Sequence, residues 1–254
     1  MDQQVNEKKS EQKFFDKILK TNSIEKCWYF WTKKIINSKV LIIGAGGLGC
    51  PVADLLARSG VGEIGIMDYD KVSLSNIHRQ TLYTAKDVNK FKVDVVKKRL
   101  NLINKYIKIN TYNRKASEKN LNNIVNKYDI IVDGSDNFKT KFLLNKYSLK
   151  FKKILIVGAI SKFDGHIFTF DFNSKKSPCL KCFYQSEPSD EILNCEAEGI
   201  LGSTANIVGA VQVNEVLKKI LNIGKDLKSN ILILDLLNLN FRKVLFKKKR
   251  NCVC

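Results

Sequence analysis

The sequence predicts a doubly wound α/β sheet, parallel in its N-terminal part and with antiparallel strands in its C-terminal part. The first observation is that short apolar runs alternate with helical patterns over residues 39–157, which is typical of a mostly parallel sheet with helices on both faces. The second is that residues 163–171 alternate between apolar and polar types, as expected for half-exposed antiparallel strands. The change of pattern falls after Gly158.

The first elements can be placed in chain order from their patterns. A β-branched run predicts a strand at 39–43, helical spacing predicts a helix near 49–59, and a second apolar run predicts a strand at 63–68. After an irregular polar stretch, helical spacing recurs at 88–103 and strand-like alternation follows at 107–112. These segments form the first β-α-β units of the predicted sheet.

The middle of the chain continues the same alternation. A short helix is predicted near 117–127, and the apolar run at 130–133 predicts a buried strand. Helical spacing then covers about 137–150, and another apolar run predicts a strand at 154–157. With the alternating residues 163–171, this completes the change from parallel to antiparallel strands.

The two ends of the chain depart from this regular pattern. Residues 1–38 are polar and lysine-rich with aromatic interruptions, and they predict a helical N-terminal extension. Residues 183–203 form a loop too long for a plain connector, so we expect it to be functional. A helix at 204–221 and strands at 230–236 and 240–246 are predicted to complete the domain.

Composition limits the classes of function. The length of 254 residues and 44% hydrophobic content suit one large folded domain. No apolar run reaches the roughly 20 residues of a membrane span, and the polar start has no signal-peptide pattern, so a cytoplasmic location is expected. The net charge of +19 comes from lysines spread along the chain, and only Lys247–Arg250 forms a compact block. Specific nucleic-acid binding is therefore not expected, although a basic surface would steer an acidic protein partner.

The most informative stretch is a glycine-rich turn that follows the first predicted strand. Gly44, Gly46 and Gly49 form Gly-x-Gly-x-x-Gly, with a further glycine at Gly47. Such a turn brings a helix N-terminus close to a phosphate, and it is typical of a Rossmann-like sheet. Asp68 closes the second strand, where a carboxylate that binds ribose is expected. The sequence therefore predicts an adenine-nucleotide site.

Two further clusters favour a triphosphate. Arg79 lies close to Asn76 and Lys92 follows on the next predicted helix, and such cations would neutralise phosphates. The alternative is a solvated loop and helix face, which for Lys92 alone is the preferred interpretation. Asp136 follows a buried strand and could hold Mg²⁺ at the carboxyl edge of the sheet. Its alternative is a helix N-cap formed by either Asp136 or Ser135.

Five of the seven cysteines are candidates for metal binding or nucleophilic catalysis. Cys179 and Cys182 have zinc-ligand spacing, and Cys252 and Cys254 can complete a tetrahedral site despite a shorter spacing. The alternative is ordinary or redox-active thiols. Cys195 lies in the long loop outside both pairs, and it is either a nucleophile or an inert thiol. A sixth, Cys50, opens the first predicted helix and is expected to be structural.

These residues together resemble the ubiquitin-activating-enzyme superfamily, in particular its ThiF/MoeB/HesA-type adenylyltransferases. The resemblance covers about residues 38–254 and rests on the Val72-x-Leu74-Ser75-Asn76-x-x-Arg79-Gln80 block in the correct order with its neighbours. The other matching motifs are Gly44–Gly49, Gly60-Val61-Gly62, Lys92, Asp133–Asn137, Cys179/Cys182 and Cys195.

The resemblance implies that residues 39–254 form an ATP-binding adenylation domain with a crossover loop at 183–203. Such enzymes use ATP and Mg²⁺ to adenylate the C-terminal glycine carboxylate of a ubiquitin-like sulfur-carrier protein, releasing pyrophosphate, in thiamin or molybdopterin biosynthesis. The residues implied to bind nucleotide are Gly44, Gly46, Gly47, Gly49, Asp68, Ser75, Asn76, Arg79, Lys92, Asp136 and Asn137. The residues implied to act in catalysis are Arg79, Lys92, Asp136 and Cys195.

The resemblance also implies structural Zn²⁺, a homodimer, and in some members a cysteine desulfurase as the source of sulfur. Cys195 matches a loop cysteine that links covalently to the carrier in ThiF-like members. One departure is that residues 1–57 contain no arginine, whereas family members usually begin with one that reaches the neighbouring subunit.

Other readings of the sequence stay open. An enzyme of the same superfamily could adenylate tRNA or a peptide, and an NAD-dependent dehydrogenase would also explain the glycine turn and Asp68. A degenerate enzyme that only binds the carrier is a further alternative.

Overall fold

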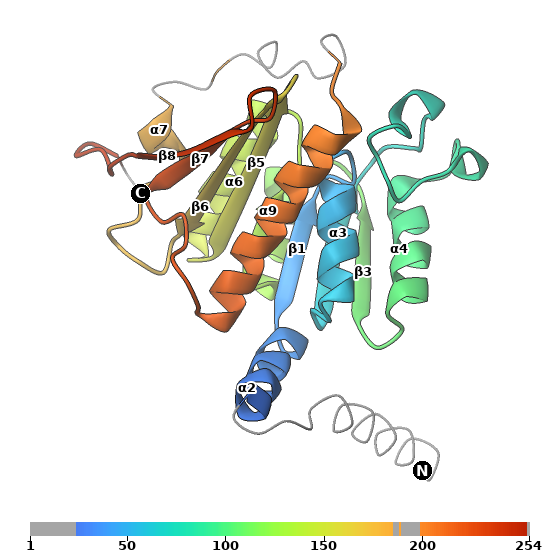
Figure 1. Ribbon diagram of the computed structural model, residues 1–254, viewed down its shortest axis with the longest axis horizontal. Helices are drawn as coiled ribbons and strands as arrows, with labels where there is room; N and C mark the ends of the chain where they lie inside the picture. The colour runs from blue at the N-terminus through green and yellow to red at the C-terminus, as the bar shows by residue number, and fades with distance from the viewer. Residues whose placement is uncertain (1–23, 185–187, 189–198, 253–254) are drawn as a thin grey trace.

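The computed structural model describes residues 24–184, 188 and 199–252, and its centre is an eight-stranded sheet of order β3-β2-β1-β4-β5-β6-β7-β8 (Figure 1). The strands are β1 (Lys39–Ile43), β2 (Glu63–Asp68), β3 (Lys108–Asn113), β4 (Ile130–Asp133), β5 (Ile154–Ser161), β6 (Asp164–Asp171), β7 (Asn230–Asp235) and β8 (Asn240–Leu245). The helices are α2 (Ile24–Ile36), α3 (Gly49–Arg58), α4 (Lys92–Ile103), α5 (Glu118–Ile124), α6 (Phe138–Lys150), α7 (Leu180–Phe183) and α9 (Gly202–Leu221). Short 3-10 helices are η1 (Leu74–Asn76), η2 (Ala85–Asp87) and η3 (Val125–Lys127).

The direction of the strands divides the sheet into two parts. Strands β3, β2, β1, β4 and β5 pair in parallel, whereas β6, β7 and β8 are added in antiparallel order. The predicted fold class is therefore confirmed. In the register of the parallel part, Ile43 lies opposite both Met67 and Asp133, so the carboxyl ends of β2, β1 and β4 share one edge.

Helices cover both faces of the parallel part. Figure 1 shows α3, α4 and α9 on the near face and α6 behind the sheet. Alternate residues of β1 enter two separate hydrophobic clusters, with Val40 and Ile42 facing α3, α4 and α9, and Leu41 and Ile43 facing α5 and α6. All four are nearly inaccessible to solvent. Burial on both faces explains why this strand is continuously apolar.

Three boundaries differ from the prediction for local reasons. The helix expected at 88–103 begins only at Lys92, because a capping box at Thr84 closes η2 and Asn89 has a positive φ of 68°. The helix expected at 117–127 divides into α5 and η3. The strand expected at 154–157 extends to Ser161, because β5 pairs with β6 up to the contact between Ser161 and Asp164.

The two ends of the chain are described in part. Helix α2 covers the last part of the predicted N-terminal extension and contacts α9, while residues 1–23 lie outside the described residues. Of the long loop predicted at 183–203, residues 185–187 and 189–198 also lie outside them. Among the described helices, none has the length and apolar character needed to cross a bilayer.

Candidate functional site

A cavity of about 1070 Å³, counted with the part open to solvent, lies at the carboxyl edge of the parallel strands. Most of the residues predicted to bind nucleotide line this cavity. They are Gly44, Gly46, Gly47, Asp68, Asn76, Arg79, Lys92, Asp136 and Asn137. The structure thus brings together side chains from three strand ends and from the start of α4.

The glycine turn gives the cavity its floor. Gly44 has a φ of 95°, and a Cβ there would lie 2.7 Å from the Gly134 carbonyl oxygen, so only glycine fits. Gly47 lines the cavity without a side chain, and a Cβ there would lie only 3.3 Å from the Ala205 side chain. Gly49 does not line the cavity and instead packs against Gly44 at the start of α3. In α3 the Cys50 and Val52 N–H groups donate to the Gly46 and Leu48 carbonyl oxygens and Pro51 has no N–H, so the positive end of the helix dipole is what suits an anion here.

Asp68 is held by two backbone N–H groups at the end of β2. Ala45 and Asp70 donate to its two carboxylate oxygens, each at 2.7 Å. Burial raises the pKa of Asp68, and the nearby Lys92 ammonium and these N–H groups oppose the shift. Each oxygen keeps a lone pair for a hydroxyl donor. The geometry suits the ribose role predicted for this residue.

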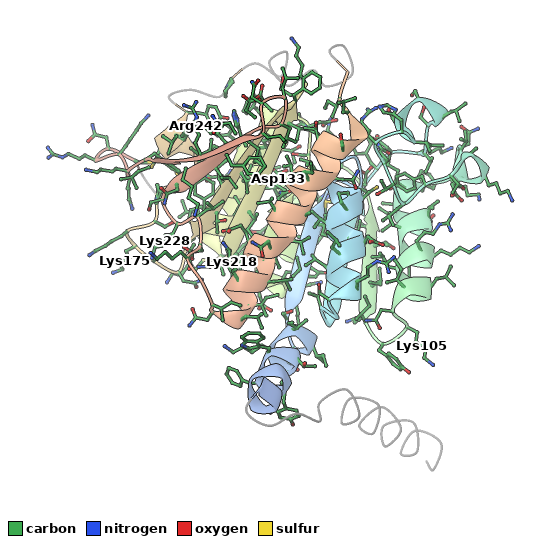
Figure 2. All side chains as sticks on the ribbon, in the orientation of Figure 1. Lys105, Asp133, Lys175, Lys218, Lys228 and Arg242 are labelled. Atoms are coloured by element: carbon green, nitrogen blue, oxygen red, sulfur yellow. The ribbon has the colours of Figure 1, made fainter. Side chains whose placement is uncertain are left out.

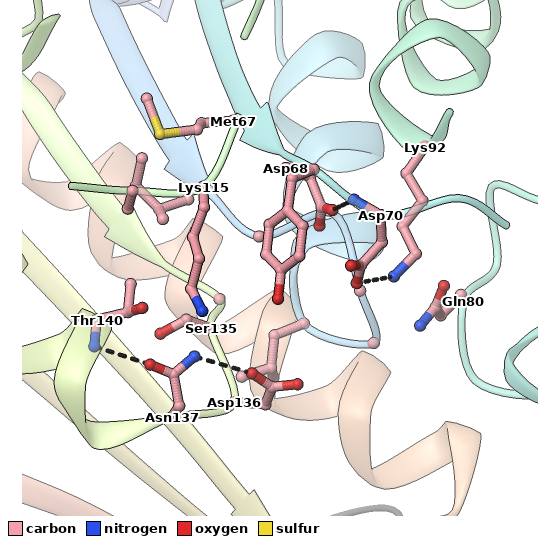
Figure 3. A pocket seen from close by; sticks show the side chains of 18 of the residues that line it. Met67, Asp68, Asp70, Gln80, Lys92, Lys115, Ser135, Asp136, Asn137 and Thr140 are labelled. Carbon is pink, nitrogen blue, oxygen red and sulfur yellow. Dashed lines mark hydrogen bonds and ion pairs between the residues drawn. The ribbon is translucent and has the colours of Figure 1, made fainter. Parts of the chain in front are cut away.

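Lys92 is buried, with a side chain only 5% exposed, and its Nζ lies 3.0 Å from Asp70 Oδ2 (Figure 3). The interpretation of Lys92 as part of a solvated helix face is therefore wrong. The reason is tertiary, because Asp70 comes from the turn after β2 and covers the start of α4. Asp70 was missed by the sequence reasoning, although its place two residues after Asp68 at a strand end was a usable signal.

Asn76 ends the 3-10 helix η1, and Arg79 lies in the turn that follows it; both line one side of the cavity. The Arg79 side chain is half-buried, and its Cδ would lie 3.8 Å from a Cβ on Gly47. Ser75 does not line the cavity, and its hydroxyl is exposed and lies 2.9 Å from that of Ser73. Gln80 does line it, and its buried Oε1 has no hydrogen-bond partner among the described residues. A ligand donor could satisfy this acceptor.

The loop between β4 and α6 presents Asp136 to the cavity. Asn137 caps α6 by accepting a hydrogen bond from the Thr140 N–H at 2.8 Å, and its Nδ2 donates to Asp136 Oδ1 at 3.1 Å (Figure 3). The alternative that Asp136 or Ser135 caps this helix is therefore wrong. Asp136 is exposed, and among the described residues no donor reaches its Oδ2. A carboxylate oxygen of this kind fits Mg²⁺.

Other side chains of the cavity were not predicted. Tyr69, Arg114 and Lys115 follow the ends of β2 and β3, and Lys115 Nζ lies 5.5 Å from the centre of the Tyr69 ring. Their position directly after predicted strands was the available signal, since ligands bind at the carboxyl edge of such sheets. Lys141 of α6 also lines the cavity, and nothing in its helical spacing distinguishes it from an exposed lysine.

A separate cluster of thiols lies beside α7. The sulfur atoms of Cys179, Cys182 and Cys252 all lie within 4.8 Å of one another. Cys179 is 3.9 Å from Cys182 and 3.5 Å from Cys252. Two sulfurs bound to one tetrahedral zinc at about 2.3 Å would lie roughly 3.8 Å apart, so the spacing fits a metal. The remaining predicted ligand Cys254, and the predicted nucleophile Cys195, lie outside the described residues.

The chain is similar to solved structures and to proteins of known sequence. The structure of E. coli MccB with ATP superposes with a TM-score of 0.76 at 23% identity, covering 89% of this chain and 69% of that one. The likeness confirms the fold. The sulfur carrier protein adenylyltransferase of Thermus thermophilus is 36% identical over 227 residues, which are 87% of this chain and 84% of that protein.

Other relatives are longer than this chain. The adenylyltransferase and sulfurtransferase MOCS3 of Culex quinquefasciatus is 38% identical over 222 residues, so the chain spans 50% of its length. A protein named "Probable molybdopterin-synthase adenylyltransferase" from Gracilaria tenuistipitata var. liui is 38% identical over 219 residues, which cover 61% of it. The model of the ThiF family matches residues 20–254. From this match and these identities, the chain belongs to the ThiF family.

Proposed function

We propose that this protein is an adenylyltransferase that activates the C-terminal glycine carboxylate of a ubiquitin-like sulfur-carrier protein with ATP. The observation that carries the proposal is one cavity that gathers a glycine turn, a carboxylate suited to ribose, two cations and a second carboxylate. The names of the relatives, which include a sulfur carrier protein adenylyltransferase and a molybdopterin-synthase adenylyltransferase, support the substrate class. Whether the pathway is thiamin or molybdopterin biosynthesis is decided by the carrier.

The reaction requires positioning and charge rather than a side-chain base. An oxygen of the carrier carboxylate, already ionised at neutral pH, attacks the α-phosphorus, and the bond to the bridging oxygen of pyrophosphate breaks. Asp68 would hold the ribose, and the N–H groups near Gly47 would contact phosphate oxygens. Arg79, Asn76 and Lys92 would offset the negative charge that grows on the departing pyrophosphate. Lys92 would then exchange its ion pair with Asp70 for one with a phosphate.

The donor set fits a magnesium ion as well. Asp136 would hold it through its unpaired Oδ2, and Asn137 would keep that carboxylate oriented through its bond to Oδ1. The ion, when bound, neutralises phosphate charge and draws the phosphate chain into one geometry.

The other parts of the proposal concern the remainder of the protein. The thiol cluster with Cys254 would bind one structural Zn²⁺. Metal analysis of the purified protein is then expected to find one zinc per chain. A homodimer, a cytoplasmic location and a cysteine desulfurase partner belong to the same proposal. If Cys195 acts covalently, intact mass after incubation with carrier and ATP shows an adduct that reductant removes and Cys195→Ser abolishes.

The test is pyrophosphate exchange into ATP that depends on the carrier and Mg²⁺. Arg79→Ala and Asp136→Ala are each expected to slow exchange at least ~100-fold, the scale for losing a preorganised charge partner. Arg58→Ala is the matched control, since Arg58 pairs with Asp54 on the surface of α3. Normal exchange in both site variants would contradict the assigned roles. Stimulation by tRNA or a peptide instead of any carrier would select a different substrate, and stabilisation by NAD rather than ATP would favour a dehydrogenase.

A further inference from the structure

A buried polar cluster lies directly beneath the loop that carries Asp136. Lys141 of α6 has a side chain 2% exposed, and its Nζ lies 3.1 Å from Asp133 Oδ2, whose side chain is inaccessible to solvent. The same ammonium donates to the carbonyl oxygens of Ser135 and Gly158, both at 2.7 Å. Figure 2 shows Asp133 in the interior of the molecule, whereas Lys105 and Lys175 extend from its periphery. A fully buried lysine is rare and requires a reason.

The hydrogen bonds of this ammonium exclude a direct role in binding a ligand. A lysine ammonium has three N–H donors, and the three acceptors around Lys141 use all of them. Although Lys141 lines the cavity, it has no donor left for a phosphate. Its charge is also balanced locally by Asp133. Its effect on a bound ligand must therefore pass through the groups that it holds.

Those groups define the path of the loop. Asp133 Oδ1 accepts hydrogen bonds from the Ser135 N–H at 2.9 Å and from its hydroxyl at 2.6 Å. The Gly134 N–H donates to the Ile43 carbonyl at 2.8 Å. The carbonyl bonded to Lys141 is that of Ser135, which belongs to the peptide group leading into Asp136. Holding that oxygen fixes the peptide plane before Asp136 and so limits where the Asp136 side chain can point.

A second helix supports the same loop from the other side. Gln212 of α9 donates from Nε2 to the Asp133 carbonyl oxygen at 2.9 Å, and its side chain is fully buried. A Cβ on Gly158 would lie 2.7 Å from the Gln212 amide, so only glycine allows this approach. The end of β4 is thus bonded to both α6 and α9. Such support restricts the loop to one arrangement.

We propose that Lys141 is a positioning residue that orients Asp136 for magnesium when the ion binds with ATP. The inference rests on the proposed function only in taking Mg²⁺ and ATP as ligands of this cavity. Residues that orient a metal ligand commonly change metal affinity by about 10- to 100-fold when they are lost. Because Lys141 does not touch the nucleotide, its loss reduces the contribution of Mg²⁺ and leaves metal-free binding of ATP nearly unchanged.

The experiment measures the affinity for α,β-methylene ATP by calorimetry, once with Mg²⁺ and once with EDTA, using the full chain. The ratio of the two affinities reports the contribution of the ion and needs neither carrier nor turnover. Lys141→Met alone would leave Asp133 buried without its partner, so the double variant Lys141→Met/Asp133→Asn removes both charges together. Lys141→Gln/Asp133→Asn, which keeps an amide donor, is the second variant if the first does not fold.

We expect the double variant to lower the Mg²⁺ ratio at least about tenfold while its affinity in EDTA stays within about threefold of the original. The second variant is expected to give an intermediate ratio. Lys146→Met is the matched control on α6, since Lys146 is exposed and pairs with Glu118. An unchanged ratio in a folded variant would overturn the proposal, even if its melting temperature falls. Pyrophosphate exchange is measured separately, so a failure of the adenylation proposal is distinguishable from a failure of this one.

Discussion

The parallel and antiparallel parts of the sheet differ in what they expose. The inner parallel strands β1, β2 and β4 are almost entirely buried, and their carboxyl ends form one wall of the cavity. In contrast, all six residues of β8 are exposed, including Phe241 and Leu245. The hairpin before it also exposes Leu239, at 76%. The parallel part of the sheet thus borders a partly open, largely polar cavity, whereas β8 presents an exposed apolar strip.

The difference follows from how each part is covered. A parallel sheet needs crossover connections, and their helices bury both faces while every strand points its end toward the same edge. The antiparallel strands β7 and β8 connect through a short turn, so no crossover helix is required over β8. Open edge strands invite pairing, and Arg242 and Lys243 are the charges that limit it here. Small-molecule chemistry is therefore expected in the parallel part and protein contacts in the antiparallel part.

The largest expected effect tests the parallel part. Lys92→Ala should slow carrier-dependent exchange at least ~100-fold, because Lys92 is the buried cation proposed to contact the phosphates. Lys98→Ala is the control, since Lys98 is exposed on the same helix α4. The measurement is pyrophosphate exchange at saturating carrier, with circular dichroism to check the fold. If Lys98→Ala slowed exchange as much as Lys92→Ala, the role proposed for Lys92 in the cavity would be wrong.

A second prediction concerns the bonds between α9 and the antiparallel part. Buried Glu215 accepts hydrogen bonds from the Thr169 hydroxyl at 2.8 Å and from the Leu227 N–H at 3.0 Å. Glu215→Ala would leave both donors unpaired, would also remove the ion pair of Glu215 with the half-buried Lys218, and is expected to lower the free energy of unfolding by about 2 kcal/mol. That corresponds to a melting temperature roughly 4–8 °C lower. Affinity for ATP should be unchanged, because Glu215 does not line the cavity.

The control for this change is Glu118→Ala, which removes an exposed pair with Lys146 and should cost little. A large loss of ATP affinity in Glu215→Ala would show that the two parts of the sheet are energetically coupled. In that case the parallel and antiparallel parts would differ in strand direction and burial but would not be independent in stability and ligand affinity.

A third, smaller effect concerns the apolar strip of β8. Phe241 is 57% exposed next to Arg242 and Lys243, which suits an apolar contact on a carrier with an acidic rim. Phe241→Ser is expected to raise the KM for carrier about fivefold, as for loss of one moderate interface contact, with the affinity for ATP unchanged. Leu102→Ser is the control, because Leu102 is 75% exposed on α4. Loss of a dimer in sedimentation, with KM unchanged, would assign the strip to a second copy of the chain.

The sequence was sufficient for the architecture and for most of the cavity, because glycine turns and strand ends are local signals. It was not sufficient for buried polar residues, and α6 shows why. On this helix the side chains of three polar residues are buried in the protein interior, although their spacing is equally compatible with a solvated face. They are Lys141, Asn145 and Ser148. Their partners come from distant segments, as when Asn145 accepts the Leu180 N–H at 2.9 Å. The burial of Lys92 by Asp70 could not be read from periodicity for the same reason.

The last prediction compares a thiol of each part. Burial raises the pKa of Cys50, behind the glycine turn, to about 12, and hydrogen bonding involving Leu82 and Tyr83 opposes the shift only partly. The ordinary pKa of a cysteine thiol is 9.0, so the folded protein binds this proton more tightly than the unfolded chain does. The protonated Cys50 thiol therefore contributes fully to the free energy of unfolding below pH 9, and this contribution is lost as pH rises toward 12. At pH 8 the buried thiol therefore stays protonated, and iodoacetamide should leave Cys50 unmodified in peptide maps until the protein is unfolded. Half-buried Cys252 should react in the folded protein once a chelator has removed bound metal. Alkylation of Cys50 at the same rate as Cys252 would mean that the packing around Cys50 opens readily. That result would contradict the tight burial described for the parallel part.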